Sequence, residues 1–155
     1  GAETPRRLNS RYIMIPRDIR DLIIKQPGRV LRSTTELDLV LRSLNDLNIS
    51  EQSELGEFFL EYCLSGVLSN RRMELLDLCS PTLQIWNATR FGRDVYDVPD
   101  EYVCLTSGES EGFVLYSVTN RRIYDIGVSE IEALENGLVQ PTWSTFFELM
   151  RWYLQ

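Results

Sequence analysis

The stretch Gly108-Glu109-Ser110-Glu111-Gly112 has the spacing of a catalytic motif. Gly-x-Ser-x-Gly is the pattern of the nucleophile elbow, where the serine lies on a strained turn between a strand and a helix. Here the residues that follow, 113–118, have the pattern of a strand, and the chain has no histidine to act as the base. The two glutamates would also oppose negative charge on an oxyanion. The pattern therefore predicts a polar turn.

Paired carboxylates are a second candidate for chemistry, because a glycosidase needs two carboxyl groups that face each other across a cleft. Acidic residues cluster around 97–101, 109–111 and 130–135. These clusters fall in expected turns and exposed stretches, where carboxylates are normally solvated. An enzyme that uses carboxylates remains an open alternative.

The cysteines and the missing histidines indicate neither a metal site nor a cofactor. Cys63, Cys79 and Cys104 are too far apart in sequence to form a Cys-x-x-Cys clamp. Each has apolar neighbours, where a free cysteine behaves as a small buried hydrophobe. Three cysteines cannot all pair within one chain, so a reducing compartment and a cytoplasmic location are expected. No apolar run approaches the ~18–20 residues that a membrane span needs.

The charge of the chain is unevenly distributed. The net charge is -7, yet residues 1–35 hold eight Lys and Arg against three Asp and Glu. The rest of the chain is therefore strongly acidic, and it should repel nucleic acids and anionic membranes and attract basic partners. Paired arginines at 6–7, 71–72 and 121–122 could touch phosphates, but the overall charge argues against a nucleic-acid interface.

Apolar residues at helical spacing predict three helices in the first part of the chain. The first covers 17–26 and ends at Pro27-Gly28. The second follows a capping box formed by Ser33 and Glu36. The third covers 50–66. Their apolar stripes are Ile19, Leu22 and Ile23, then Leu37, Val40, Leu41 and Leu44, then Leu55, Phe58, Phe59, Tyr62 and Cys63.

Beyond Gly66 the pattern changes towards that of strands, which are expected at 83–86, 102–106, 112–118 and 122–127. The last two form a hairpin about Thr119-Asn120. A two-residue loop gives this hairpin a purely apolar face, which should meet the core. That face comprises Phe113, Leu115, Tyr124 and Ile126, and the other comprises Val114, Tyr116, Ile123 and Asp125.

A last helix is predicted after Pro141 from the spacing of Trp143, Phe146, Phe147, Met150 and Leu154. We expect Trp143, Phe146 and Met150 to bury against the apolar hairpin face. Helices, then an antiparallel sheet, then a helix packed on it, predict an α+β fold. Residues 1–32 form a basic N-terminal segment with one short helix, and residues 33–155 form a single domain.

Several motifs of residues 33–155 resemble the SUKH superfamily, the Smi/Knr-like proteins. Its central hairpin is similar to Glu111–Tyr116 followed by Arg122–Asp125, and its closing helix to Trp143-x-x-Phe146 with Trp152-Tyr153-Leu154. Its opening resembles Asn48-Ile49 with the helix that follows, and Tyr96-x-x-Pro99-Asp100-Glu101-Tyr102 is similar to the segment before its first strand.

The resemblance implies an α+β fold and, in bacteria, an immunity protein that binds and neutralises a cognate toxin. Such toxins are commonly nucleases delivered by contact-dependent inhibition or type VI secretion. The family has no shared catalytic residues, so the resemblance implies a non-enzyme. A regulatory scaffold, as in the eukaryotic Smi/Knr members, is the alternative function.

The expected partner is a basic protein toxin, bound by acidic groups on the sheet and its loops. We predict that Glu109, Glu111, Asp125, Asp97 and Asp100 provide the charge. Tyr116 and Trp86 are the expected aromatic anchors, because interface energy concentrates in buried Tyr, Trp and Arg.

Overall fold

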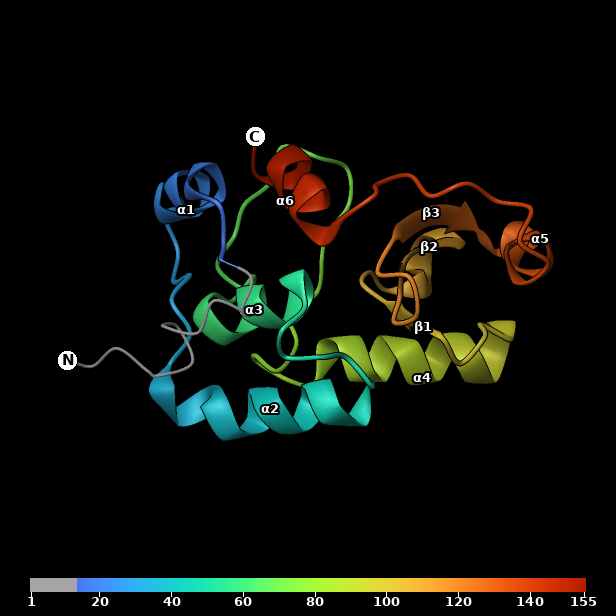
Figure 1. Cartoon of the computed structure of the whole chain (residues 1–155), viewed down its shortest axis with the longest axis horizontal. Coiled ribbons are helices and arrows are strands. Elements are labelled where there is room, and N and C mark those ends of the chain that lie inside the picture. Colours follow the sequence, from blue (N-terminus) through green and yellow to red (C-terminus); the bar gives the residue numbers. More distant parts are fainter. Residues whose placement is uncertain (1–13) are drawn as a thin grey trace.

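The computed structural model describes residues 14–155, which form an α+β fold with a three-stranded antiparallel sheet in the order β1-β2-β3. In Figure 1, α1, α2, α3 and α6 gather on one side of the molecule, and the sheet, α4 and α5 gather on the other. The elements are α1 Arg17–Ile24, α2 Leu37–Asp46, α3 Glu54–Glu61, α4 Gln84–Tyr96, β1 Tyr102–Cys104, β2 Gly112–Ser117, β3 Ile123–Gly127, α5 Ile131–Glu135 and α6 Phe146–Leu154.

Local capping signals determine where the first helices begin. The predicted capping box is present: the backbone N–H of Thr35 donates to Ser33 Oγ, and that of Ser33 donates to Glu36 Oε1, both at 3.3 Å. This box starts a 3-10 turn that leads into α2. The third helix begins at Glu54 rather than Ser50, because Ser53 is its cap and accepts the N–H of Gly56 at 3.1 Å.

The prediction of a strand at 83–86 is wrong, because residues 84–86 form the first turn of helix α4. Its buried residues are Ile85, Ala88, Thr89 and Gly92, which follow helical spacing. A Cβ atom at Gly92 would lie 3.0 Å from Cys104 Sγ, so glycine lets the helix pack closely on β1. All three cysteines are free and buried, as expected, and burial raises the pKa of Cys104 to about 12.

The hairpin has the predicted register, with Phe113 opposite Ile126 and Leu115 opposite Tyr124. Its loop is longer than expected, because Ser117 and Arg122 already form a backbone hydrogen bond at 3.0 Å and leave four residues between them. The left-handed residue is Arg121, with φ of 64°, and not Asn120.

Both faces of the hairpin are buried, and α6 lies on the face opposite to the one predicted. The face with Phe113 packs against α4 and α5, in a cluster that includes Ala88 and Leu134. Val114, Tyr116 and Ile123 instead share the larger core with Phe146 and Met150 of α6. The expectation failed because the second face is also largely apolar, so alternation alone could not tell which face meets α6.

Trp143 precedes α6 and is only half-buried. It forms an isolated bridge with Ile123 of β3 and contacts Trp152, with ring centroids 5.1 Å apart.

The core extends across the expected boundary at residue 32. Ile19 and Ile23 of α1 are fully buried in the same cluster as α6. Asp18 of α1 accepts a hydrogen bond from Arg151 of α6 at 2.5 Å, which lowers the pKa of Asp18. Within residues 14–155, no helix has the length and apolar character that a membrane crossing requires.

Candidate functional site

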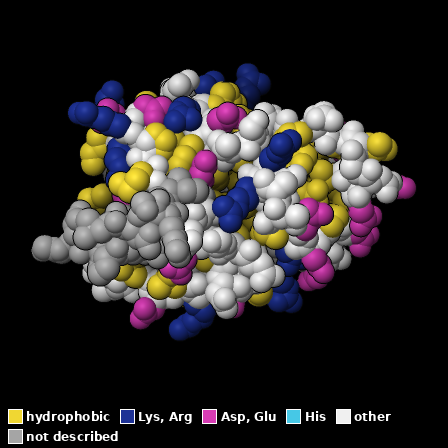
Figure 2. Space-filling view, viewed as in Figure 1, with side chains coloured by type: hydrophobic (Ala, Val, Ile, Leu, Met, Phe, Trp, Pro, Cys, Tyr) yellow, Lys and Arg dark blue, Asp and Glu magenta, His cyan; other side chains and the backbone are white. Residues whose placement is uncertain are grey.

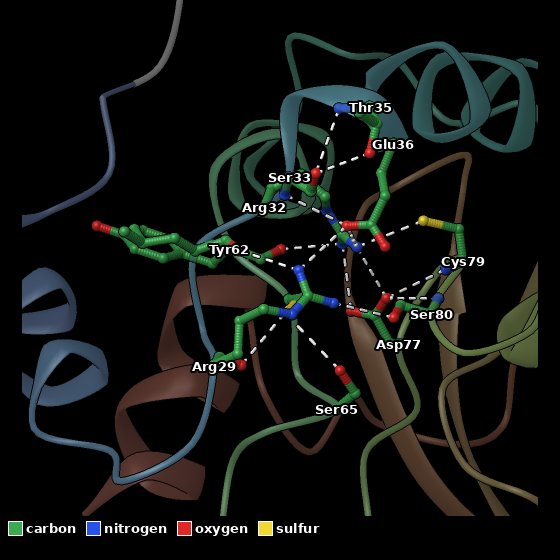
Figure 3. A network of polar contacts seen from close by, with 12 residues as sticks. Arg29, Arg32, Ser33, Thr35, Glu36, Tyr62, Ser65, Asp77, Cys79 and Ser80 are labelled. Carbon is green, nitrogen blue, oxygen red and sulfur yellow. Dashed lines mark hydrogen bonds and ion pairs between the residues drawn. The ribbon is translucent and has the colours of Figure 1, made fainter.

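A buried ion pair joins the segment before α2 to the loop before α4 (Figure 3). The side chains of Arg32 and Asp77 are 1% and 0% exposed. The guanidinium donates to both carboxylate oxygens, at 3.0 and 3.2 Å, and Arg32 Nε donates to the carbonyl of Phe59 at 2.8 Å. The second terminal nitrogen also donates to the carbonyl of Tyr62 at 2.9 Å.

The carboxylate of Asp77 has hydrogen-bond partners for its oxygens, as the guanidinium of Arg32 has for its nitrogens. It accepts the backbone N–H groups of Leu64 at 2.8 Å, Cys79 at 3.2 Å and Ser80 at 3.0 Å. Burial raises the pKa of the Cys79 thiol, which lies beside the pair, to about 11. A buried charge is tolerated when it is paired and hydrogen-bonded. This cluster therefore connects two segments of the fold and has no charge left for a ligand.

A groove of about 920 Å³ lies on the surface of residues 14–155. It runs between the loop 70–74 and the open end of the β2–β3 hairpin, where Gly112 lies opposite Gly127. Because neither glycine has a side chain, the pair leaves space at this end of the sheet. Trp152 of α6 also lines the groove.

One side of the groove, the acidic wall, consists of Glu109, Glu111 and Asp125. All three residues are exposed. Glu109 belongs to a 3-10 turn, Gly108–Ser110, and Glu111 adopts a left-handed conformation with φ of 60° before the chain enters β2. Although Asp125 as a residue is exposed, partial desolvation of its carboxyl group raises its pKa, and the nearby charge of Glu130 adds to the effect.

The opposite side of the groove, the arginine wall, consists of Arg71, Arg72 and Trp152. The guanidinium of Arg71 lies 4.5 Å from the centre of the Trp152 ring, and its Nε donates to the carbonyl of Trp152 at 2.8 Å. Ser69 Oγ donates to the carbonyl of Tyr153 at 2.7 Å. Carbonyls in the last turn of a helix lack partners within the helix, so α6 holds this loop in place.

Sequence reasoning named the three residues of the acidic wall as partner-binding, which stays a prediction, and missed the arginine wall. Arg71 and Trp152 are 81 residues apart, and no local pattern links them. The double arginine at 71–72 and the closing Trp152 were both visible in the sequence. Only the packing of the loop on α6 brings them together.

Two further acidic residues of the predicted site lie outside the groove. Asp97 ends α4 in a left-handed conformation, and Asp100 is in the turn that leads to β1. Both are exposed, and Asp100 lies 3.9 Å from Arg93 Nε. Figure 2 shows acidic side chains gathered at the end of the molecule that holds α5.

The expected aromatic anchors do not line the groove either. Tyr116 is 2% exposed and is one of the largest fully buried side chains, because its face of β2 turns towards the larger core. Its hydroxyl group forms a hydrogen bond with Ser53, and burial raises the pKa of Tyr116. The prediction that Tyr116 is an exposed anchor is therefore wrong, and Tyr116 is a core residue. Trp86 is half-buried on α4, where Arg90 lies 5.6 Å from its ring centre.

The motif around Ser110 has the backbone expected of a turn. The 3-10 turn Gly108–Ser110 is followed by the strand β2, whereas a nucleophile elbow is followed by a helix.

Comparison with known proteins found no family model, no curated protein and no solved structure that matches this chain.

Proposed function

We propose that this protein is a non-catalytic immunity protein, which binds a basic bacterial toxin and blocks it. The observation that carries the proposal is the position of Glu109, Glu111 and Asp125. The sequence predicts that these residues bind the partner, and all three line one groove. The net charge of -7 and the resemblance to the SUKH superfamily support the same function.

The charge pattern suits an inhibitor of a nuclease-type toxin. A nuclease needs a basic surface to bind the phosphate backbone of its substrate. An acidic partner attracted to that surface associates rapidly and covers the site that the substrate needs. The acidic wall would therefore provide both the steering and the blockage.

Co-expression with the product of the adjacent gene tests the proposal, which predicts that this product is the toxin. Cells that make both proteins should grow, cells that make the toxin alone should die, and a pull-down at low salt should recover the complex. The double variant Glu109→Lys/Glu111→Lys should protect less well. Asp21→Lys/Asp46→Lys is the matched control, because it makes the same change of charge at exposed positions on α1 and α2.

Equal cell death with and without this protein, together with no recovered complex, would contradict the proposal. A regulatory scaffold of the Smi/Knr type would then be the better account.

A further inference from the structure

Within residues 14–155, the backbone N–H groups on both outer edges of the sheet already have acceptors, which disfavours strand addition by a partner. On the free side of β3, the backbone N–H of Ile123 donates to Trp143, that of Asp125 to Thr142 Oγ1 and that of Gly127 to Glu130 Oε1, at 2.9–3.0 Å.

The free side of β1 is closed in the same way. The N–H of Tyr102 donates to the carbonyl of Pro99 at 3.0 Å, and that of Cys104 donates to Thr89 Oγ1 at 2.9 Å. Strand addition needs unpaired backbone groups on an edge. A partner therefore gains little from strand addition here, and the side chains of the groove are the better means of recognition.

We infer that a segment of the partner inserts a basic side chain into the groove, between the acidic wall and Trp152, and is held there by side-chain contacts alone. This inference rests on the proposed function and specifies how the same surface recognises its partner. In this inference the anchoring residues are Trp152 and Arg71, whereas the sequence predicted Tyr116 and Trp86.

Charge complementarity identifies the occupant as basic. Within residues 14–155, no Lys or Arg lies within ion-pair distance of Glu109, Glu111 or Asp125. On the opposite wall, Arg71 is already bonded to Trp152. The lining of the groove holds more carboxylates than cations: four (Glu74, Glu109, Glu111 and Asp125) against two (Arg71 and Arg72). The groove as a whole therefore attracts a basic group. No cation is among the causes of the raised pKa of Asp125. A basic group bound beside Asp125 would lower this pKa and favour the ionised form.

Trp152 gives the occupant an apolar surface in a fixed position. Its ring is half-buried between Trp143 and Arg71, so little side-chain freedom is lost when a partner covers it. Tryptophan and arginine are also the residue types that most often dominate binding energy at interfaces.

Gly127 offers a way to fill the groove without disturbing the fold. A Cβ atom there would be no closer than 3.8 Å to the nearest heavy atoms, and the backbone has an ordinary φ of -79°. Gly127→Leu should therefore fold normally and occupy space that the inserted side chain needs. Ser129→Leu is the matched control, because Ser129 is exposed nearby and does not line the groove.

The first test uses the full chain and a short probe, so that it does not depend on the toxin. The ¹⁵N-labelled protein is titrated with the peptide acetyl-Arg-Leu-Arg-amide and with acetyl-Glu-Leu-Glu-amide as the counterpart of opposite charge. We expect the arginine peptide to shift the amide signals of the acidic wall and the indole signal of Trp152. Gly127→Leu should weaken this binding by about tenfold or more, and Ser129→Leu should not.

The inference fails if the arginine peptide shifts signals elsewhere, if the glutamate peptide binds equally well, or if Gly127→Leu binds as tightly as the wild type. The second test repeats the comparison with the toxin. If the wild type does not protect cells although the arginine peptide enters its groove, the proposed function fails and the inference stands. If Gly127→Leu protects cells and binds the toxin as well as the wild type does, the inference fails and the proposed function stands.

Discussion

The Arg32–Asp77 pair and the acidic wall of the groove are both charged, yet they serve different purposes. The buried pair is less than 2% exposed and bonded on every side by its own chain. Glu109, Glu111 and Asp125 are exposed and have no cationic partner among the described residues. Charges that the fold satisfies stabilise its segments, whereas charges that it leaves unpaired are available to another molecule.

Breaking the buried pair should strongly destabilise the fold. Arg32→Met leaves the carboxylate of Asp77 without its cation in a fully buried site. We expect the free energy of unfolding to fall by about 3–5 kcal/mol. Urea denaturation followed by circular dichroism measures the change.

Two controls separate charge from burial at this pair. Arg29→Met removes a guanidinium whose side chain is 49% exposed and should cost less than about 1 kcal/mol. The double variant Arg32→Met/Asp77→Asn should be more stable than Arg32→Met alone, because it leaves no unpaired buried charge and keeps an oxygen that accepts backbone N–H groups. If Arg32→Met and Arg29→Met cost the same, the contrast between buried and exposed charge is wrong.

Trp143 lies between the two situations, because it is half-buried and supports Trp152 of the arginine wall. Trp143→Ala should lower the free energy of unfolding by about 1–3 kcal/mol, from lost burial and a lost aromatic contact. Phe146→Ala, at a side chain that is 2% exposed, should cost about 3–5 kcal/mol. Equal losses in the two variants would mean that Trp143 is a core residue after all.

Local patterns in the sequence predicted much of the fold. The capping box at Ser33, the buried stripe of α1 and the hairpin register all depend on residues close together in the chain. The α4 helix was missed because its buried face contains Ala88, Thr89 and Gly92, which contribute little to a hydrophobic pattern.

Long-range contacts account for the parts of the site that the sequence did not reveal. The arginine wall depends on a loop packed on α6, and the burial of Tyr116 depends on which face of the hairpin meets α6. The acidic wall was predictable because its members flank or lie within one hairpin.

Asp125 of the acidic wall gives the smallest expected effect, which depends on pH. Burial and Glu130 raise its pKa, so ionisation of Asp125 opposes folding. Asp125→Asn should be slightly more stable than the wild type at pH 7. The difference should disappear as the pH falls below the ordinary value of 3.8, where the carboxyl group is neutral in both the folded and the unfolded state. Thermal unfolding from pH 3 to pH 8 measures it, and a less stable variant at pH 7 would be the contrary result.

The rate of association with the toxin tests the central claim most directly. At low salt, Glu109→Lys/Glu111→Lys should associate about tenfold or more slowly than the wild type, and Asp21→Lys/Asp46→Lys should be much less affected. The difference should shrink towards 1 M salt, where the Debye length falls to about 3 Å. Stopped-flow mixing of the two proteins measures these rates. Equal slowing by both double variants, or a rate that does not change with salt, would contradict a partner that is steered to the acidic wall.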